Sequence, residues 1–294
     1  MIQSRQMGDV RVTRVLEYAA PTHPPEFLFP DLSAEQLAAD STWLAPNHYI
    51  THMDRLIVTI QLWIVHAGSN VIVIDTGVGN HKPRTAARMN MLNSLVLPWL
   101  EAAGAARSQV THVVHTHLHS DHIGWNTVWN GSGWEPTFPN ARYFLPKRDF
   151  DFYDAQVKAG PVALIDTSFA DSLYPIIEAG LADFITDDIK EIADILRVEQ
   201  APGHSPGMLN FSFVAGGQEA IFTADVFHSP LQIAHPTLNT GYCELPEEAR
   251  RTRAAVLSRA ADNGSLILPM HFGPPHCGFV RREGNGYRFE PVTW

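Results

Sequence analysis

The chain has 294 residues, 45% of them hydrophobic and 18% charged, which is the composition of a soluble globular protein of one large or two modest domains. Its net charge of −10 argues against nucleic acid as a partner, and no apolar run is long enough to cross a membrane. Two cysteines exclude a disulfide framework, and the start of the chain lacks the apolar run of a signal peptide. We therefore expect a cytoplasmic protein.

In the first half of the chain, hydrophobic patterning predicts a strand at 9–18 and a β-hairpin formed by 56–66 and 70–77. Between them, residues at about 20–55 are rich in proline and large aromatics, which is typical of an irregular, lid-like loop. Residues 83–103 have a helical pattern that ends at Gly104. A further strand leads into the stretch HTHLHSDHIG.

The second half repeats this alternation of apolar strands and helices. The pattern predicts strands and helices in the order strand 141–146, helix 147–158, strands 194–203, 208–216 and 218–225, helix 246–264 and strand 265–273. Strands interleaved with helices in both halves favour two packed sheets covered by helices, although the alternation alone also allows a doubly wound sheet. The motifs have to decide between these folds.

The stretch His115–Gly124 reads HTHLHSDHIG and concentrates metal-ligand chemistry at the end of a strand. His117, His119, Asp121 and His122 are spaced so that a turn directs them toward one volume. Imidazole and carboxylate are ligands that suit Zn²⁺, Mn²⁺ or Fe²⁺. A purely structural role would require a separate buried partner for each polar group. The stretch therefore predicts a metal site.

Three downstream residues extend this set, and each follows an apolar strand. His204 lies in APGHSPG, Asp225 ends IFTAD and His271 ends LILPMH. Any one of them alone is more often a cap or a satisfied core residue. Together they supply the additional ligands that a second metal ion would need. GHSPG resembles a serine nucleophile elbow only superficially, because its histidine and proline are misplaced for that strained turn.

With these motifs the chain resembles the metallo-β-lactamase superfamily over nearly its whole length. The matching segments are IDTG, HTHLHSDHIG, APGHSPG, FTADVFH and LPMHFG. The resemblance implies an α+β fold, the αβ/βα sandwich of two mixed β-sheets flanked by helices. It also implies a single domain over 1–294 that carries the lid-like loop.

The resemblance implies a binuclear centre of two divalent metal ions, with Zn²⁺ expected and Mn²⁺, Co²⁺ or Fe²⁺ as alternatives. One ion would be held by His117, His119 and His204. The other would be held by Asp121, His122 and His271, and Asp225 would bridge both. Asp75 of IDTG matches the aspartate that orients the metal-binding loop in that family.

Within the superfamily, the segments around the ligands resemble the branch of N-acyl homoserine lactonases and methyl parathion hydrolase. This implies a hydrolase in which a metal-bridging hydroxide opens lactones or cleaves related esters. Asp121, or alternatively Asp225, would pass a proton to the leaving group. Secreted organophosphate hydrolases carry a signal peptide, and the first residues of this sequence do not have that pattern. We therefore favour a lactonase or esterase. The alternatives are phosphotriester or thioester hydrolysis and an iron-dependent redox reaction of the same fold.

Aromatic residues beside the ligands are candidates for a pocket that holds a small ester or lactone substrate. The candidates that follow ligand motifs or lie in the lid-like loop are Trp125, Phe227, His228, Phe272, His276, Phe27, Phe29 and Trp43. Packing is an equally good explanation for any single one of them. A homodimer is compatible with the sequence, but no interface can be recognised in it.

Overall fold

The computed structural model describes all residues from 1 to 294. The chain forms two compact units, and each is built from two separate stretches of sequence. Unit 1 consists of Met1–Glu17 and Ile60–Val198, and unit 2 of Tyr18–Thr59 and Glu199–Trp294. The chain passes from one unit to the other within three strands, β2, β4 and β12.

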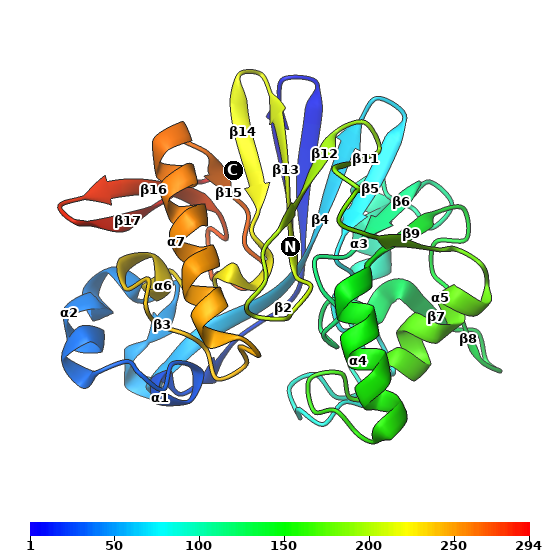
Figure 1. Cartoon of the computed structure of the whole chain (residues 1–294), viewed down its shortest axis with the longest axis horizontal. Helices are drawn as coiled ribbons and strands as arrows, with labels where there is room; N and C mark the ends of the chain where they lie inside the picture. Colours follow the sequence, from blue (N-terminus) through cyan, green and yellow to red (C-terminus); the bar gives the residue numbers. More distant parts are fainter. The chain divides into compact units, whose positions relative to one another are not determined.

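Unit 1 is organised around a mixed sheet with the strand order β1-β2-β4-β5-β6-β9-β10 (Figure 1). The β1–β2 and β4–β5 pairs are antiparallel, whereas β5, β6, β9 and β10 run parallel to one another. The strands are β1 (Ile2–Met7), β2 (Val10–His23), β4 (Arg55–Ala67), β5 (Asn70–Ile74), β6 (His112–Val114), β9 (Arg142–Pro146) and β10 (Ala182–Ile185). β7 (Thr127–Trp129) and β8 (Trp134–Pro136) form a separate two-stranded antiparallel sheet. β11 (Glu191–Ile192) pairs antiparallel with β12 (Leu196–Gln200), and these two strands are the first of the second, seven-stranded sheet.

Short helices flank this sheet. They are α3 (Val96–Ala102), α4 (Lys147–Ala159) and α5 (Tyr174–Glu178), with the single turns η2 (Gly124–Asn126) and η3 (Phe169–Leu173). Helix α4 ends at Gly160 and turns Phe150, Tyr153 and Val157 toward a hydrophobic cluster, at the three- and four-residue spacing of one helix face. The face of α4 that holds Tyr153 is therefore fixed by packing.

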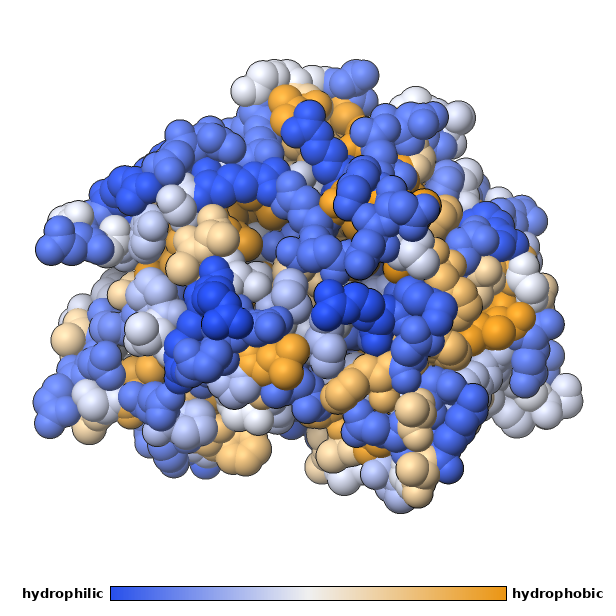
Figure 2. All heavy atoms as spheres, in the orientation of Figure 1, coloured by the Kyte–Doolittle hydropathy of each residue, from blue (hydrophilic) through white to orange (hydrophobic).

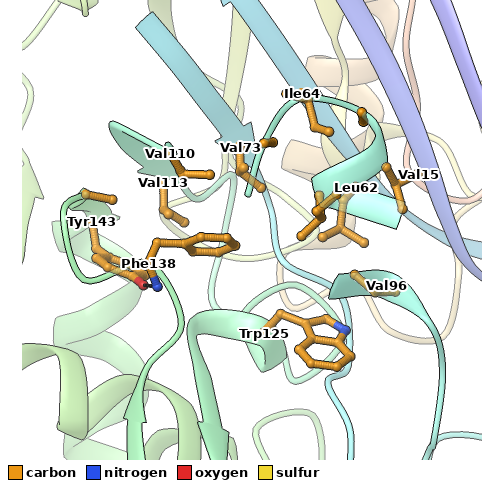
Figure 3. Packing of buried hydrophobic residues seen from close by; sticks show 14 of the residues in the cluster. Val15, Leu62, Ile64, Val73, Val96, Val110, Val113, Trp125, Phe138 and Tyr143 are labelled. Carbon is orange, nitrogen blue, oxygen red and sulfur yellow. Dashed lines mark hydrogen bonds between the residues drawn. The ribbon is translucent and has the colours of Figure 1, made fainter. Parts of the chain in front are cut away.

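The core of unit 1 contains β-branched residues from the strands and three large rings. Figure 3 shows Phe138 next to Val73 and Val113 of the sheet, with Tyr143 beside Phe138 and Trp125 in another part of the same cluster. All of these side chains are at most 3% exposed. Burial of side chains of this size stabilises a fold by about 1.5–3 kcal/mol each. The loop that follows the HTHLHSDH stretch is thus anchored in the core through Trp125.

Unit 2 contains the sheet order β13-β14-β15-β16-β17, in which β14 and β15 are parallel and the other neighbours antiparallel. The strands are β13 (Leu209–Ala215), β14 (Gln218–Phe222), β15 (Leu266–Ile267), β16 (Gly278–Glu283) and β17 (Gly286–Pro291). Helix α7 (Pro246–Asn263) contacts β16 and ends at Gly264, whose φ of 63° is one that glycine adopts without strain.

The segment at about 20–55, expected to be irregular, is instead largely structured. It forms α1 (Pro25–Leu28), α2 (Ala34–Leu44), β3 (Tyr49–Ile50) and η1 (Thr51–Met53), and it packs in a cluster that includes Leu231 of α6 (Leu231–Ala234). A reciprocal pair of hydrogen bonds between Ser33 and Gln36 forms a capping box that starts α2. Its role as a lid and the single-domain organisation remain predictions.

The expected helix at 83–103 is wrong in its first half, since only α3 is helical there. At the start of this segment, Lys82 Nζ lies 3.3 Å from Asp171 Oδ1, and Arg84 Nη1 lies 2.7 Å from Asp171 Oδ2. These buried ion pairs hold the chain before α3 in an irregular path. The β16–β17 hairpin was missed. The fold class is confirmed, because the structure has two mixed sheets with flanking helices. No helix in it has the length and apolar character required to span a membrane.

Candidate metal centre

In unit 1, the histidines of the HTHLHSDH stretch converge in the loop that follows β6. His117 Nε2 lies 3.1 Å from His119 Nδ1, and the ring of His117 lies 3.9 Å from that of His122, measured between centroids. All three side chains are buried. Asp121, whose Oδ1 lies 3.7 Å from His122 Nε2, keeps 22% of its side chain exposed. It is thus the accessible acid of this loop.

Asp75 binds the loop through hydrogen bonds, as predicted from its place in IDTG. Its carboxylate accepts hydrogen bonds from the Thr116 backbone N–H at 2.8 Å and from the Thr116 hydroxyl at 2.7 Å. It also lies 2.8 Å from Nδ1 of His122. Burial by itself would raise the pKa of Asp75, but His122 and His115 outweigh it and hold that pKa below its ordinary value. An ionised Asp75 therefore fixes Nδ1 of His122 as the donor and turns Nε2 away from it.

Helix α4 provides a second support that sequence reasoning missed. The Tyr153 hydroxyl lies 2.7 Å from Nε2 of His119, and Asp149 Oδ2 accepts a hydrogen bond from the Leu118 backbone N–H at 3.3 Å. Asp149 and Tyr153 are four residues apart on one helix face, and both are fully buried. The only sequence signal for this support was an acid and a tyrosine at four-residue spacing on one face of the predicted helix 147–158.

Glu17 is a third buried support, at the end of the unit 1 part of β2. Its carboxylate accepts hydrogen bonds from the backbone N–H groups of Val78 and Gly79 at 2.6 and 3.1 Å, and from Trp125 Nε1 at 2.7 Å. Burial raises the pKa of Glu17 to about 7, although these three donors oppose the shift. A single carboxylate therefore ties the loop after β5 to the loop after the HTHLHSDH stretch.

The same two loops approach so closely that glycine is required. A Cβ on Gly124 would lie 1.8 Å from the carbonyl oxygen of Val78, so any side chain there would force the loops apart. The final glycine of HTHLHSDHIG is therefore a packing requirement of this junction.

In unit 2, three imidazoles meet at one carboxylate oxygen. Asp225 Oδ2 lies 3.2 Å from Nε2 of His204, 3.2 Å from Nε2 of His228 and 3.0 Å from Nε2 of His271. All four side chains are buried. His228, which the sequence predicts as a substrate contact, thus lies in the same cluster as the predicted ligands His204, Asp225 and His271.

The residues of this cluster come from three separate turns, whose backbone geometry positions them. Asp225 follows Ala224, whose positive φ of 46° is costly for a residue with a Cβ and redirects the chain at the end of β14. Gly203, with a φ of 142°, brings the turn before His204 so close that a Cβ would lie 2.3 Å from the backbone of Ala249 in α7.

His271 is oriented through its other ring nitrogen. Nδ1 lies 2.7 Å from the carbonyl oxygen of Thr59, and the Thr59 N–H donates to the His271 carbonyl at 3.1 Å. A backbone acceptor at Nδ1 places the proton there and leaves Nε2 as a lone pair toward Asp225. This is the tautomer that a metal ligand requires.

The predicted substrate-pocket residues fall into two groups. Four are fully or almost fully buried in hydrophobic clusters: Trp125, Phe227, Phe272 and Phe29. His276 is also buried and hydrogen-bonds through Nδ1 to the carbonyl oxygen of Phe272 at 2.7 Å. Phe27 and Trp43 are 59% and 42% exposed. The buried positions are explained by packing, and substrate contact by any of these residues stays a prediction.

The donor sets fit divalent metal ions. Potential ligand atoms of Asp75, His117 and His122 in unit 1 all lie within 4.8 Å of one another, as do those of His204, Asp225 and His228 in unit 2. Both sets are buried and combine imidazole with carboxylate, which is the ligand chemistry of Zn²⁺ and related ions. The Asp75 carboxylate is already engaged by Thr116, whereas Asp121 is partly exposed, so Asp121 as the acid ligand of this loop stays a prediction.

Comparison with known families agrees with this chemistry. Residues 59–271 match the family model of the metallo-beta-lactamase superfamily, a range that includes all seven predicted ligands. The chain belongs to the metallo-β-lactamase superfamily. No curated protein sequence matches it.

Several solved structures share the fold over 91% to 100% of this chain. The hydrolase AbOPH is 23% identical with a TM-score of 0.80, and the match covers 100% of this chain and 98% of AbOPH. AidC, a dizinc quorum-quenching lactonase in complex with a product, is 21% identical with a TM-score of 0.77 and the same coverage. An N-acyl homoserine lactone hydrolase with N-hexanoyl-L-homoserine at its catalytic metal centre is 14% identical with a TM-score of 0.62, covering 91% of this chain and 94% of that one.

Proposed function

We propose that this protein is a hydrolase with two divalent metal ions that opens lactones or cleaves related carboxylic esters. The observation that carries the proposal is the convergence of His204, His228 and His271 on Asp225 in a buried setting. Such a carboxylate is costly to bury for structure alone, and a metal ion explains the whole arrangement. Superfamily membership over residues 59–271 supports the same reading.

We assign the ligands as the family motif implies. His117, His119 and His204 would hold one ion, Asp121, His122 and His271 the other, and Asp225 both. Asp75 and Tyr153 would orient His122 and His119 through the hydrogen bonds described above. His228 is a candidate for a further contact beside Asp225.

When bound, the two ions lower the pKa of a water molecule and polarise the carbonyl of the substrate. The chain's own part is to hold ligands in place and to move a proton. Asp121 is the proposed proton shuttle: its carboxylate would accept the proton that the attacking water loses and pass it to the leaving alkoxide. Its side chain is 22% exposed, whereas those of Asp75 and Asp225 are at most 3% exposed.

The proposed preference for lactones rests on structural similarity to two lactonases. AidC and the N-acyl homoserine lactone hydrolase are lactonases that share the fold, and the second contains its product at the metal centre. Zn²⁺ is the proposed ion because AidC is a dizinc enzyme.

A substrate panel tests this function directly. The zinc-loaded protein would be mixed with aliphatic lactones, N-acyl homoserine lactones, aryl esters, thioesters and a phosphotriester, and proton release followed with a pH indicator. We expect the fastest release from lactones. If only the phosphotriester or only the thioester were turned over, that compound class would replace lactones and carboxylic esters as the proposed substrate. No release from any of them, with both ions bound, would overturn the hydrolase proposal and favour the iron-dependent redox alternative.

A further inference from the structure

Unit 2 contains a cavity that the proposed reaction does not use. Its volume is about 400 Å³, within the range of pockets that bind small molecules. Its walls come from α2, the turn after α2, and the β16–β17 hairpin, which projects beside α2 in Figure 1 and lies above a recess in the surface in Figure 2. None of the seven predicted metal ligands lines it.

The cavity has aromatic walls. Trp43, His48, Tyr287 and Phe289 all line it, and the ring of His48 packs edge-on against Phe289 with the centroids 6.1 Å apart. Trp43 is 42% exposed, so part of its indole remains accessible from outside the protein. Flat aromatic faces of this kind suit a planar ring, by stacking or edge-to-face contact.

His48 supplies one polar group to these walls. Its side chain is 5% exposed, and Nδ1 is fully buried without a hydrogen-bond partner. Burial lowers the pKa of His48 to about 4, so the ring is neutral at physiological pH. A sealed Nδ1 with no acceptor is less costly as a lone pair than as an N–H, which places the proton on Nε2. The ring therefore has one N–H to donate.

The charged groups at the rim are already paired. Asp40 Oδ2 lies 2.6 Å from Nε2 of His235, and Glu283 lies 3.4 Å from Arg288. Asp40 also accepts a hydrogen bond from Trp43 Nε1 at 2.8 Å, which fixes that indole. Each of these groups therefore already has a polar partner within the protein.

We propose that this cavity is a second binding site, for an uncharged aromatic molecule that carries a hydrogen-bond-accepting oxygen. The ring would lie among Trp43, Tyr287 and Phe289, and the oxygen would accept a hydrogen bond from His48. The site is independent of the metal centre and of the proposed lactone substrate.

The test uses three probes on the full-length, zinc-loaded protein, with binding measured by ligand-observed NMR titration. Acetophenone has both the ring and the acceptor, toluene has only the ring, and cyclohexyl methyl ketone has only the acceptor. We expect acetophenone to bind at least about threefold more tightly than either of the others, the gain of one hydrogen bond or one aromatic contact.

Two variants locate the site, and a third is the control. Trp43→Ala should weaken acetophenone binding about threefold to tenfold, and His48→Phe should abolish the preference over toluene. Trp129→Ala, another exposed tryptophan but in unit 1, should leave binding unchanged. Because Trp43 lies on the surface, its variant stays informative if His48→Phe does not fold.

The proposal is overturned if no probe saturates, if Trp43→Ala binds acetophenone as the wild type does, or if the probe is displaced by a lactone that the enzyme turns over. The last result would place acetophenone at the metal centre. Saturation by the probes and the effect of Trp43→Ala are measured without turnover of the proposed substrate, so the binding proposal and the hydrolase proposal fail separately.

Discussion

The two clusters of candidate metal ligands, one in each unit, are built in opposite ways. In unit 1 the ligands come from one short loop, and the residues that orient them, Asp75 and Tyr153, come from a strand end and a helix far away in sequence. In unit 2 the ligands themselves come from three distant turns and meet at Asp225. The first cluster is a local motif with remote supports, whereas the second exists only through tertiary structure around one carboxylate.

If this contrast is correct, the largest single effect should come from Asp225. Asp225→Asn removes a charge that three imidazoles face, and we expect the metal content to fall and turnover to drop by at least about a hundredfold. Metal analysis and initial rates with a lactone measure both. Asp262→Asn, an acid on the surface of the same unit, is the control and should behave as the wild type. Normal metal content and turnover in Asp225→Asn would remove the bridging assignment.

Asp75→Asn should have the next largest effect, since it weakens a support and not a ligand. We expect metal affinity to fall about tenfold to a hundredfold, the usual range for residues that orient metal-bound histidines. Competition with a chromogenic chelator measures the affinity. Thr116→Val removes only one of the hydrogen bonds to Asp75 and should cost less. Equal affinities for Asp75→Asn and the wild type would show that His122 needs no such support.

Glu17 tests the junction behind the unit 1 loop through the pH dependence of folding. Its pKa is about 7 in the folded protein and has an ordinary value of 4.5, so between these pH values the unfolded chain has lost a proton that the folded protein retains. Stability therefore falls as pH rises through this window, by roughly 3 kcal/mol in total, and is constant above it.

Glu17→Gln cannot titrate and should lack this component, whatever its absolute stability. The measurement is the free energy of unfolding in urea at pH 5, 6, 7 and 8, compared as the difference between variant and wild type. Other titrating groups are shared and cancel in that difference. A difference that does not change with pH would mean that the Glu17 carboxyl titrates normally in the folded protein.

The smallest effect is expected from Tyr153→Phe. It deletes the hydroxyl that lies 2.7 Å from His119 and leaves the buried ring in place. One lost hydrogen bond corresponds to about 0.5–1.5 kcal/mol, so metal affinity should fall by up to about tenfold with little change in thermal stability. Phe152→Leu, at an exposed neighbouring position, is the control. A larger loss of metal affinity in Tyr153→Phe than in Asp75→Asn would show that Tyr153 is the more important of the two supports.

The sequence predicted what depends on local pattern. Two apolar runs rich in β-branched residues located the β4–β5 hairpin, and the helical pattern of α7 with Gly264 at its end located that helix. HTHLHSDH is contiguous, so its grouping was visible without a structure. His204, Asp225 and His271 were found because each follows an apolar strand, but their meeting at a single oxygen was not visible in the sequence.

What was missed depends on contacts between distant residues. The start of the 83–103 segment has helix-forming residues, yet the buried pairing of Lys82 and Arg84 with Asp171 overrides that propensity. Glu17 and Tyr153 carry no local signal of their roles, because their partners are more than 30 residues away in the chain. Phe227 and Phe272 are adjacent to ligand motifs in sequence but lie in the core.

The most direct test of the account is the number of metal ions in the purified protein, measured by elemental analysis against protein concentration and repeated after treatment with a chelator and reconstitution with Zn²⁺. The account predicts two ions per chain, with lactone turnover lost on removal and restored when both ions return. One ion per chain at full activity, or full activity with none, would contradict the dinuclear centre.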